Sequence, residues 1–219
     1  MATEMMISIV NPESPDGSDK QYEIKYLEYT LSTVVTIKPS SVDKWISDIE
    51  GTYHDRLDSL VVGLDIEWLH NDSKKVEHRA ATLQLCVESS CLIFQIIHAT
   101  EIPMSLKNFL KNPQYTFVGV GIEYDAEKLF RDYELVVRRK SELKTLALEE
   151  TGVKTVVNKG LTELAAMVLE KDKETMKLES ATMSPWDDKQ LTLEQVQYAS
   201  LDAFLSFVTG KILLFGKQS

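Results

Sequence analysis

The stretch Leu60-Val-Val-Gly-Leu-Asp-Ile-Glu-Trp68 decides the fold, because its apolar residues predict a strand in the middle of a sheet. Successive strand side chains point to opposite faces, so the even-numbered residues Val62 to Trp68 share one face. Asp65 and Glu67 project together from the other face. Two ionised carboxylates on a buried strand are costly unless a cation or strong hydrogen-bond donors lie beside them. The strand contains no basic residue, so a bound metal is the simplest answer.

A second acidic patch lies near the end of the chain. Apolar residues between Leu193 and Val208 recur at helical spacing and predict a helix over 192–214. Tyr198 and Asp202 are four residues apart on it, so their side chains share one face, with about 5–6 Å between Cβ atoms. A phenol and a carboxylate therefore converge on one small volume.

A third patch is centred on Asp125. The short apolar run 116–121 predicts a strand that ends in glycine, and 125–133 predicts the helix that follows it. A residue at this junction lies at the edge of a sheet, where α/β enzymes place working side chains. Asp125 is therefore a candidate for the same site as the two other patches.

The three motifs together resemble the DnaQ-like 3′–5′ exonucleases of the DEDDy subgroup. The matching stretches are Asp65-Ile-Glu67, Gly121-Ile-Glu-Tyr-Asp125 and Tyr198-Ala-Ser-Leu-Asp202, and the resemblance runs from about Ser59 to Leu214. Within the subgroup the chain looks most similar to Werner-syndrome-type exonuclease domains and to the plant RISC-interacting clearing exoribonucleases. One departure is Leu69-His70 after Trp68, where many relatives carry a proline, and it bears on substrate contacts.

The resemblance implies a ribonuclease-H-like fold and a site for two ions, Mg2+ or Mn2+. It assigns Asp65 to both ions, Glu67 and Asp202 to one of them, and Asp125 to the other. It also implies that Tyr198 orients the attacking water, with Glu67 helping. The implied activity is hydrolysis of nucleic acid from its 3′ end to nucleoside 5′-monophosphates, with single-stranded RNA favoured. A Werner-type 3′–5′ DNA exonuclease is the alternative within the family.

Two readings from other classes stay open at this point. Each motif alone is more often structural, and only the five residues in order favour a nuclease-type metal site. A degenerate paralogue could keep the fold and bind nucleic acid or protein without cutting. A metal-dependent phosphatase or nucleotidase could use the same acids on a small substrate.

The charge balance limits the kind of nucleic-acid contact. The 219 residues hold 24 basic and 34 acidic side chains, a net charge of −10, whereas nucleic-acid binders usually carry a basic footprint. This favours a small footprint on one 3′ end over tight duplex binding. Lys128, Arg131 and the run Arg138-Arg-Lys140 form the one candidate basic patch. By resemblance, a closed hexamer could bring such segments to a neighbouring subunit's site, and an RNA-silencing protein could be a partner.

The remaining pattern predicts one α/β globule with a mixed sheet of five or six strands flanked by helices. Residues 1–58 are expected to add a hairpin, over 22–26 and 31–37, and a helix capped by Ser41; residues 59–219 form the exonuclease domain. Strands over 60–68, 81–87 and 91–97 form an antiparallel meander, 116–121 adds a parallel strand, and 135–137 adds a short one.

Some hairpin residues look exposed and apolar, namely Tyr26, Tyr29, Val34 and Val35. Either a neighbouring subunit or their own domain must cover them.

Sequence features also bear on the cellular compartment. No run approaches the length of a membrane span, and no basic-then-apolar N-terminal signal is present. Cys86 and Cys91 flank a predicted turn and are expected to be reduced core thiols. The protein is therefore expected in the cytoplasm or nucleus, not secreted, and without a membrane partner.

Overall fold

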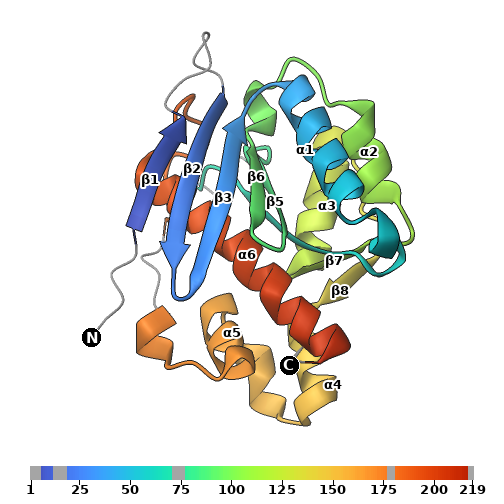
Figure 1. The fold of residues 1–219 in the computed structure, drawn as a ribbon, viewed down its shortest axis with the longest axis vertical. Coiled ribbons are helices and arrows are strands. Elements are labelled where there is room, and N and C mark those ends of the chain that lie inside the picture. Colours follow the sequence, from blue (N-terminus) through green and yellow to red (C-terminus); the bar gives the residue numbers. More distant parts are fainter. Residues whose placement is uncertain (1–5, 12–18, 71–76, 177–180, 217–219) are drawn as a thin grey trace.

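The computed structural model describes residues 6–11, 19–70, 77–176 and 181–216, in which one mixed sheet lies between two layers of helices (Figure 1). The sheet has eight strands in the order β1-β2-β3-β6-β5-β4-β7-β8. The strands are β1 (Met6–Asn11), β2 (Asp19–Tyr26), β3 (Tyr29–Thr36), β4 (Val61–Glu67), β5 (Thr82–Val87), β6 (Ser90–Phe94), β7 (Thr116–Gly119) and β8 (Lys140–Glu142).

The helices divide between the two faces of the sheet. One face carries α1 (Pro39–Thr52), α2 (Met104–Lys111) and α3 (Ile122–Tyr133), and the other carries α4 (Leu143–Thr151), α5 (Leu161–Leu169) and α6 (Leu193–Phe215). Short 3-10 helices are η1 (His54–Ser59), η2 (Ile96–His98), η3 (Lys154–Asn158) and η4 (Lys173–Met176). Each face has its own apolar core.

The alternation in β4 places its side chains as predicted. Val62, Leu64 and Ile66 lie in the core under α1 to α3, whereas Val61 lies in the core under α6. The β4–β5–β6 meander is antiparallel and the β4–β7 pair is parallel, and both predictions are confirmed. Because β3 is parallel to β6 and β8 to β7, the carboxyl ends of β3, β6, β4, β7 and β8 all meet at one edge.

The N-terminal hairpin extends this same sheet, because β3 pairs with β6 from Ser32↔Ser90 to Thr36↔Phe94. The prediction of five or six strands was therefore wrong. The hairpin's apolar residues are covered by their own chain: Tyr26 is 3% exposed, its hydroxyl donates to the Met176 carbonyl (3.0 Å), and the Tyr29 ring lies 4.9 Å from Phe204 of α6. The hairpin's apolar residues therefore give no support for a hexamer, which is suggested by the family resemblance alone.

Two local predictions were wrong for identifiable reasons. Helix α1 begins at Pro39 rather than behind a Ser41 cap, and the Ser41 hydroxyl instead donates to Asp19 (2.9 Å). Residues 135–137 form no strand, although Leu135 and Val137 are buried, and the following amide of Arg138 donates to the Leu110 carbonyl at the end of α2. The edge strand is β8, which begins only at Lys140.

Helix α6 runs diagonally across one face of the sheet (Figure 1). Thr192 caps it, accepting from the Gln195 amide (3.2 Å) while the Gln195 side chain accepts from the Thr192 amide (2.9 Å). Contrary to the expectation from sequence, its 23 residues are long and apolar enough to cross a membrane. However, 61% of the most apolar 18-residue stretch of this helix is buried inside the protein, as expected for a core helix.

Glycine lets α6 lie directly on β4. A Cβ atom on Gly63 would stand 2.0 Å from the Ala203 carbonyl oxygen and 2.7 Å from the Phe207 amide nitrogen, both backbone atoms. Only a residue without a side chain therefore allows this approach. Gly63 precedes Asp65 by two residues on the same strand face, so the close approach also brings Asp65 toward α6.

The two cysteines face each other across the β5–β6 turn. Cys86 pairs with Cys91 in the strand register, their Sγ atoms are 2.8 Å apart, and both thiols are free and buried. The prediction of reduced core thiols is confirmed.

Candidate metal centre and active site

Three of the predicted acids meet between β4 and α6. Asp65 and Glu67 come from the C-terminal end of β4 and Asp202 from the third turn of α6, and one carboxylate oxygen of each lies within 4.8 Å of the others. Glu67 is 5% exposed. Residues far apart in the chain therefore form one acidic cluster, in which Glu67 is buried and Asp65 and Asp202 are partly buried, at the edge where the parallel strands end.

Like charges and burial work against ionisation in this cluster. Burial, followed by the charges of Asp202, Asp125 and Glu67, raises the pKa of Asp65 well above its ordinary value. Burial and the charges of Asp202 and Asp125 raise the pKa of Glu67 to about 9, and burial raises the pKa of Asp202 to about 7. The cluster is short of positive charge.

One oxygen in the cluster also lacks a partner. Asp65 Oδ2 is buried without a hydrogen bond among the described residues. Buried carboxylate oxygens almost always have a donor or a cation beside them. Oxygen ligands with compensating negative charge suit a hard divalent cation such as Mg2+ or Mn2+, so the residues present fit the predicted metal.

Asp125 lies beside this cluster and not within it. It is in the first turn of α3, 7% exposed, and its charge acts on both Asp65 and Glu67. Burial and the charge of Glu142 raise the pKa of Asp125 to about 7. Helix α3 begins at Ile122, three residues before the predicted start, behind a left-handed Gly121. Asp125 therefore approaches the acids from the β7 side of the same edge.

Tyr198 lies one helical turn before Asp202, as predicted. Its hydroxyl is 3.1 Å from Thr182 Oγ1, and its ring centroid is 6.2 Å from that of Trp186. Burial and the charge of Asp202 raise the pKa of the Tyr198 phenol. The phenol is therefore neutral at physiological pH and suits an orienting role.

The structure adds two polar residues that no motif indicated. Glu142 at the end of β8 accepts from the Gly121 amide (2.7 Å) and bears electrostatically on Asp125. Thr182 holds the Tyr198 hydroxyl from the loop before α6. Neither has a sequence signal, because each acts through a contact that only the folded chain creates.

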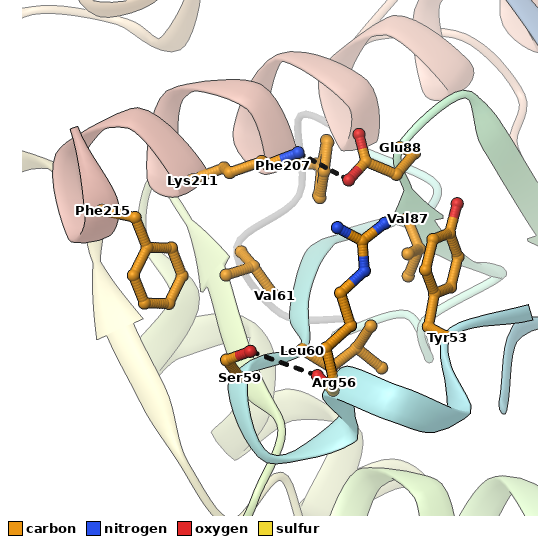
Figure 2. A pocket seen from close by; sticks show the side chains of 10 residues that line it. All are labelled: Tyr53, Arg56, Ser59, Leu60, Val61, Val87, Glu88, Phe207, Lys211 and Phe215. Carbon is orange, nitrogen blue, oxygen red and sulfur yellow. Dashed lines mark hydrogen bonds and ion pairs between the residues drawn. The ribbon is translucent and has the colours of Figure 1, made fainter. Parts of the chain in front are cut away.

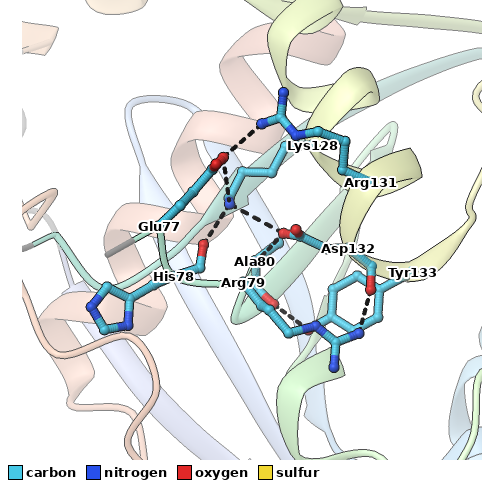
Figure 3. A network of polar contacts seen from close by, with 8 residues as sticks. All are labelled: Glu77, His78, Arg79, Ala80, Lys128, Arg131, Asp132 and Tyr133. Carbon is cyan, nitrogen blue, oxygen red and sulfur yellow. Dashed lines mark hydrogen bonds and ion pairs between the residues drawn. The ribbon is translucent and has the colours of Figure 1, made fainter. Parts of the chain in front are cut away.

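The predicted basic patch is mostly neutralised. The Lys128 side chain is 0% exposed and is held by Asp132 and Glu77, and Arg131 pairs with Glu77 at 2.7 Å (Figure 3). Lys140 pairs with Glu123 at 3.4 Å, which leaves Arg138 and Arg139 exposed. A continuous basic track beside the acids is therefore absent among the described residues.

Aromatic residues adjoin two of the acids in the chain. The Trp68 ring, directly after Glu67, has its centroid 4.8 Å from that of His70 and 5.7 Å from that of Tyr124. Tyr124, directly before Asp125, is 47% exposed, with the Arg131 guanidinium 5.8 Å from its ring. Flat surface of this kind can stack nucleobases.

A cavity of about 200 Å³ lies away from these acids. It is bounded by η1, the start of β4 and the last turns of α6, with Lys211 and Glu88 paired across it at 2.6 Å (Figure 2). Val61, which lines it, begins β4, whereas Glu67 ends the strand. This cavity is therefore separate from the acidic cluster.

A mixed sheet flanked by helices, with buried acids at the carboxyl edge of its strands, defines a ribonuclease-H-like α/β protein with a metal-type site. The chain belongs to the 3′–5′ exonuclease family, whose model matches residues 38–214. The family resemblance seen in the three motifs is thereby confirmed.

Three relatives illustrate the similarity. A "3′-5′ exonuclease" of Arabidopsis thaliana is 34% identical over 69% of this chain and 52% of its own length. The mouse "Bifunctional 3′-5′ exonuclease/ATP-dependent helicase WRN" is 33% identical over 84% of this chain and 13% of its own. "Protein RISC-INTERACTING CLEARING 3′-5′ EXORIBONUCLEASE 1" of Arabidopsis thaliana is 26% identical over 65% of this chain and 70% of its own length. The chain thus spans about half the length of the first relative and about an eighth of the length of the second.

The cluster makes a pH-dependent prediction for the metal-free protein. Unfolding returns the acids to ordinary pKa values of 3.8 and 4.5, whereas the folded cluster keeps pKa values of about 7 for Asp202 and about 9 for Glu67. The folded state binds more protons between these values, so the free energy of unfolding should fall as pH rises from about 4 to 9.

Thermal unfolding in EDTA at pH 5, 7 and 9 measures this fall. Saturating Mg2+ should flatten the dependence, because a cation favours the ionised cluster. Asp65→Asn should also flatten it in EDTA. A midpoint that rises from pH 5 to pH 9 in EDTA would contradict the raised pKa values.

Proposed function

We propose that the protein is a metal-dependent 3′–5′ exonuclease that hydrolyses single-stranded nucleic acid to nucleoside 5′-monophosphates. The observation that carries the proposal is the cluster of Asp65, Glu67 and Asp202, whose carboxylate oxygens lie within 4.8 Å of one another, together with Asp65 Oδ2, which has no hydrogen-bond partner among the described residues. Two divalent ions, when bound, neutralise the phosphodiester and lower the pKa of water. Membership of the exonuclease family supports the same reaction.

The position of each acidic residue indicates its role in metal binding. Asp65 has a buried oxygen without a hydrogen-bond partner among the described residues and would be a ligand of the ions. Glu67 and Asp202 flank it and would complete one ion's ligands, whereas Asp125, on α3, would serve the second. Glu142 braces the turn before α3 through the Gly121 amide.

Tyr198 is proposed to orient the attacking water. Its neutral phenol is held by Thr182 at 3.1 Å, and its raised pKa argues against a general-base role. We expect Tyr198→Phe to lower kcat about 100-fold, the scale of a positioned proton-handling group, while Mn2+ affinity stays unchanged. Single-turnover cleavage and calorimetric metal titration measure the two quantities. A Tyr198→Phe enzyme with weakened Mn2+ binding would make Tyr198 a support for the ligands instead.

A polymer substrate suits the surroundings of the acids better than a small phosphomonoester does. Trp68 and Tyr124 directly adjoin Glu67 and Asp125 in the chain, and the exposed Tyr124 ring offers a stacking surface for a base, which is worth about 1–3 kcal/mol. Such stacking needs little basic surface, in keeping with the net charge of −10.

RNA is the proposed polymer. Similarity to the plant clearing exoribonuclease supports RNA, whereas similarity to the mouse exonuclease–helicase favours the alternative of a Werner-type DNA exonuclease. Discrimination between RNA and DNA depends on one or two contacts to the 2′-hydroxyl of the substrate.

A time course on 5′-labelled single-stranded RNA and DNA of one sequence, with Mg2+, Mn2+ or EDTA, tests the proposal. We expect a ladder that shortens from the 3′ end, faster on RNA, with no cleavage in EDTA. An intact oligomer beside hydrolysed mononucleotides would indicate a nucleotidase. An intact oligomer with no Mn2+ binding would indicate a silent paralogue.

A further inference from the structure

A lysine side chain is completely buried next to the acidic site. Lys128 is on α3, three residues after Asp125, and its side chain is 0% exposed. An ammonium group removed from water costs several kcal/mol unless acceptors replace its hydration. Three acceptors do so: the His78 carbonyl, Asp132 at 3.1 Å and Glu77 at 3.7 Å.

These acceptors belong to a network that joins α3 to the segment entering β5 (Figure 3). Asp132 accepts from the Ala80 amide at 2.7 Å, the Tyr133 hydroxyl donates to the Ala80 carbonyl, and the Arg79 guanidinium lies 4.2 Å from the Tyr133 ring. The next amide, that of Ala81, donates to the Glu67 carbonyl at 2.8 Å. The network therefore ends on the backbone of a site residue.

Lys128 touches the β4 side of the site as well. Its ammonium lies 5.3 Å from the centroid of the Trp68 ring, and Trp68 directly follows Glu67. Residues three apart on a helix are neighbours on its surface, so Lys128 lies beside Asp125. One cation thus contacts both the element that carries Glu67 and the element that carries Asp125.

We infer that Lys128 is a positioning residue that fixes Asp125 on α3 relative to Asp65 and Glu67 on β4. The inference rests on the proposed function, because the spacing matters when the four acids share divalent ions. Asp125 lies outside the set of acids whose oxygens are within 4.8 Å of one another, so the placement of α3 decides how Asp125 reaches the site.

The test is Mn2+ titration by calorimetry of wild type, Lys128→Met and the double variant Lys128→Met with Asp132→Asn. Removing the ammonium alone leaves Asp132 without its cation and lowers stability, whereas the double variant removes both charges and should restore much of it. We expect both variants to bind Mn2+ about 10-fold more weakly, the lower end of effects seen for residues that orient metal ligands.

Tyr133→Phe is the matched control. It removes the hydroxyl bonded to Ala80 in the same network but leaves Lys128, Trp68 and Asp132 in place. It should lower the thermal midpoint and leave the Mn2+ dissociation constant unchanged. Saturating Mn2+ should return the cleavage rate of the folded double variant to near the wild-type value.

The outcomes separate the inference from the function. Wild-type Mn2+ affinity in the double variant would overturn the positioning role while leaving the proposed function intact. A wild-type protein that binds no Mn2+ would overturn the proposed function itself. Equal loss of affinity in Tyr133→Phe would reduce Lys128 to a general contributor to stability.

Discussion

Asp65→Ala should abolish nucleic-acid cleavage and the heat of Mn2+ binding while making the metal-free protein more stable. The substitution removes the acid whose pKa is raised by all three of its acidic neighbours. Several kcal/mol of transition-state stabilisation depend on the bound ions, so we expect a rate loss of at least about 1,000-fold. Stability in EDTA at pH 8 should rise, because one of several mutually repelling carboxylates is gone.

Opposite signs for activity and stability distinguish a ligand from a structural residue. Asp58→Ala is the matched control, since Asp58 is an exposed acid in η1 and its loss changes net charge by the same amount. Its cleavage rate and thermal midpoint should stay close to wild type. Near-wild-type cleavage by Asp65→Ala would overturn the assignment of the site.

Gly63→Ala should be among the most destabilising single-methyl additions in the chain. The new Cβ would stand 2.0 Å from the Ala203 carbonyl oxygen, and a backbone atom in the middle of α6 cannot turn aside as a side chain can. Overpacking usually costs about 1–3 kcal/mol, and a clash with two backbone atoms should cost at least about 3 kcal/mol. Urea denaturation followed by circular dichroism measures the loss.

Gly51→Ala is the comparison for this effect. Gly51 is helical in α1, and a Cβ atom added there would meet nothing within 4 Å, so alanine should stabilise the protein by about 0.5–1 kcal/mol. Any folded Gly63→Ala protein should also bind Mn2+ weakly, because α6 would carry Asp202 away from β4. Unchanged stability of Gly63→Ala would mean that α6 can shift without cost.

The grouping of acids in the candidate site could be predicted from sequence because these residues obey local rules. A period of two placed Asp65 and Glu67 on one strand face, and a spacing of four placed Tyr198 beside Asp202. Family resemblance then joined patches that no local rule connects. The approach that actually brings the patches together depends on Gly63, whose role emerges only once α6 lies across β4.

The features that sequence did not reveal share a physical cause. Burial and charge pairing depend on partners that are distant in the chain: Lys128 looks like a surface cation by type, yet Glu77 and Asp132 surround it. Leu135 and Val137 are buried, as a strand over 135–137 would require, but the chain there pairs with no strand among the described residues. The predicted sheet was too small because the pairing of β3 with β6 joins segments that are separated in the chain by α1, β4 and β5.

The pairing of β3 with β6 also bears on aggregation. A strand at the border of a sheet presents unpaired amides and carbonyls that recruit other chains. Residues Cys91 to Phe94 of β6 are entirely buried, and the family match begins at residue 38, after β3 has ended. The N-terminal strands therefore cover the β6 edge of the matched region in this chain. The hairpin thus covers the β6 edge and makes β1 the border strand on that side of the sheet.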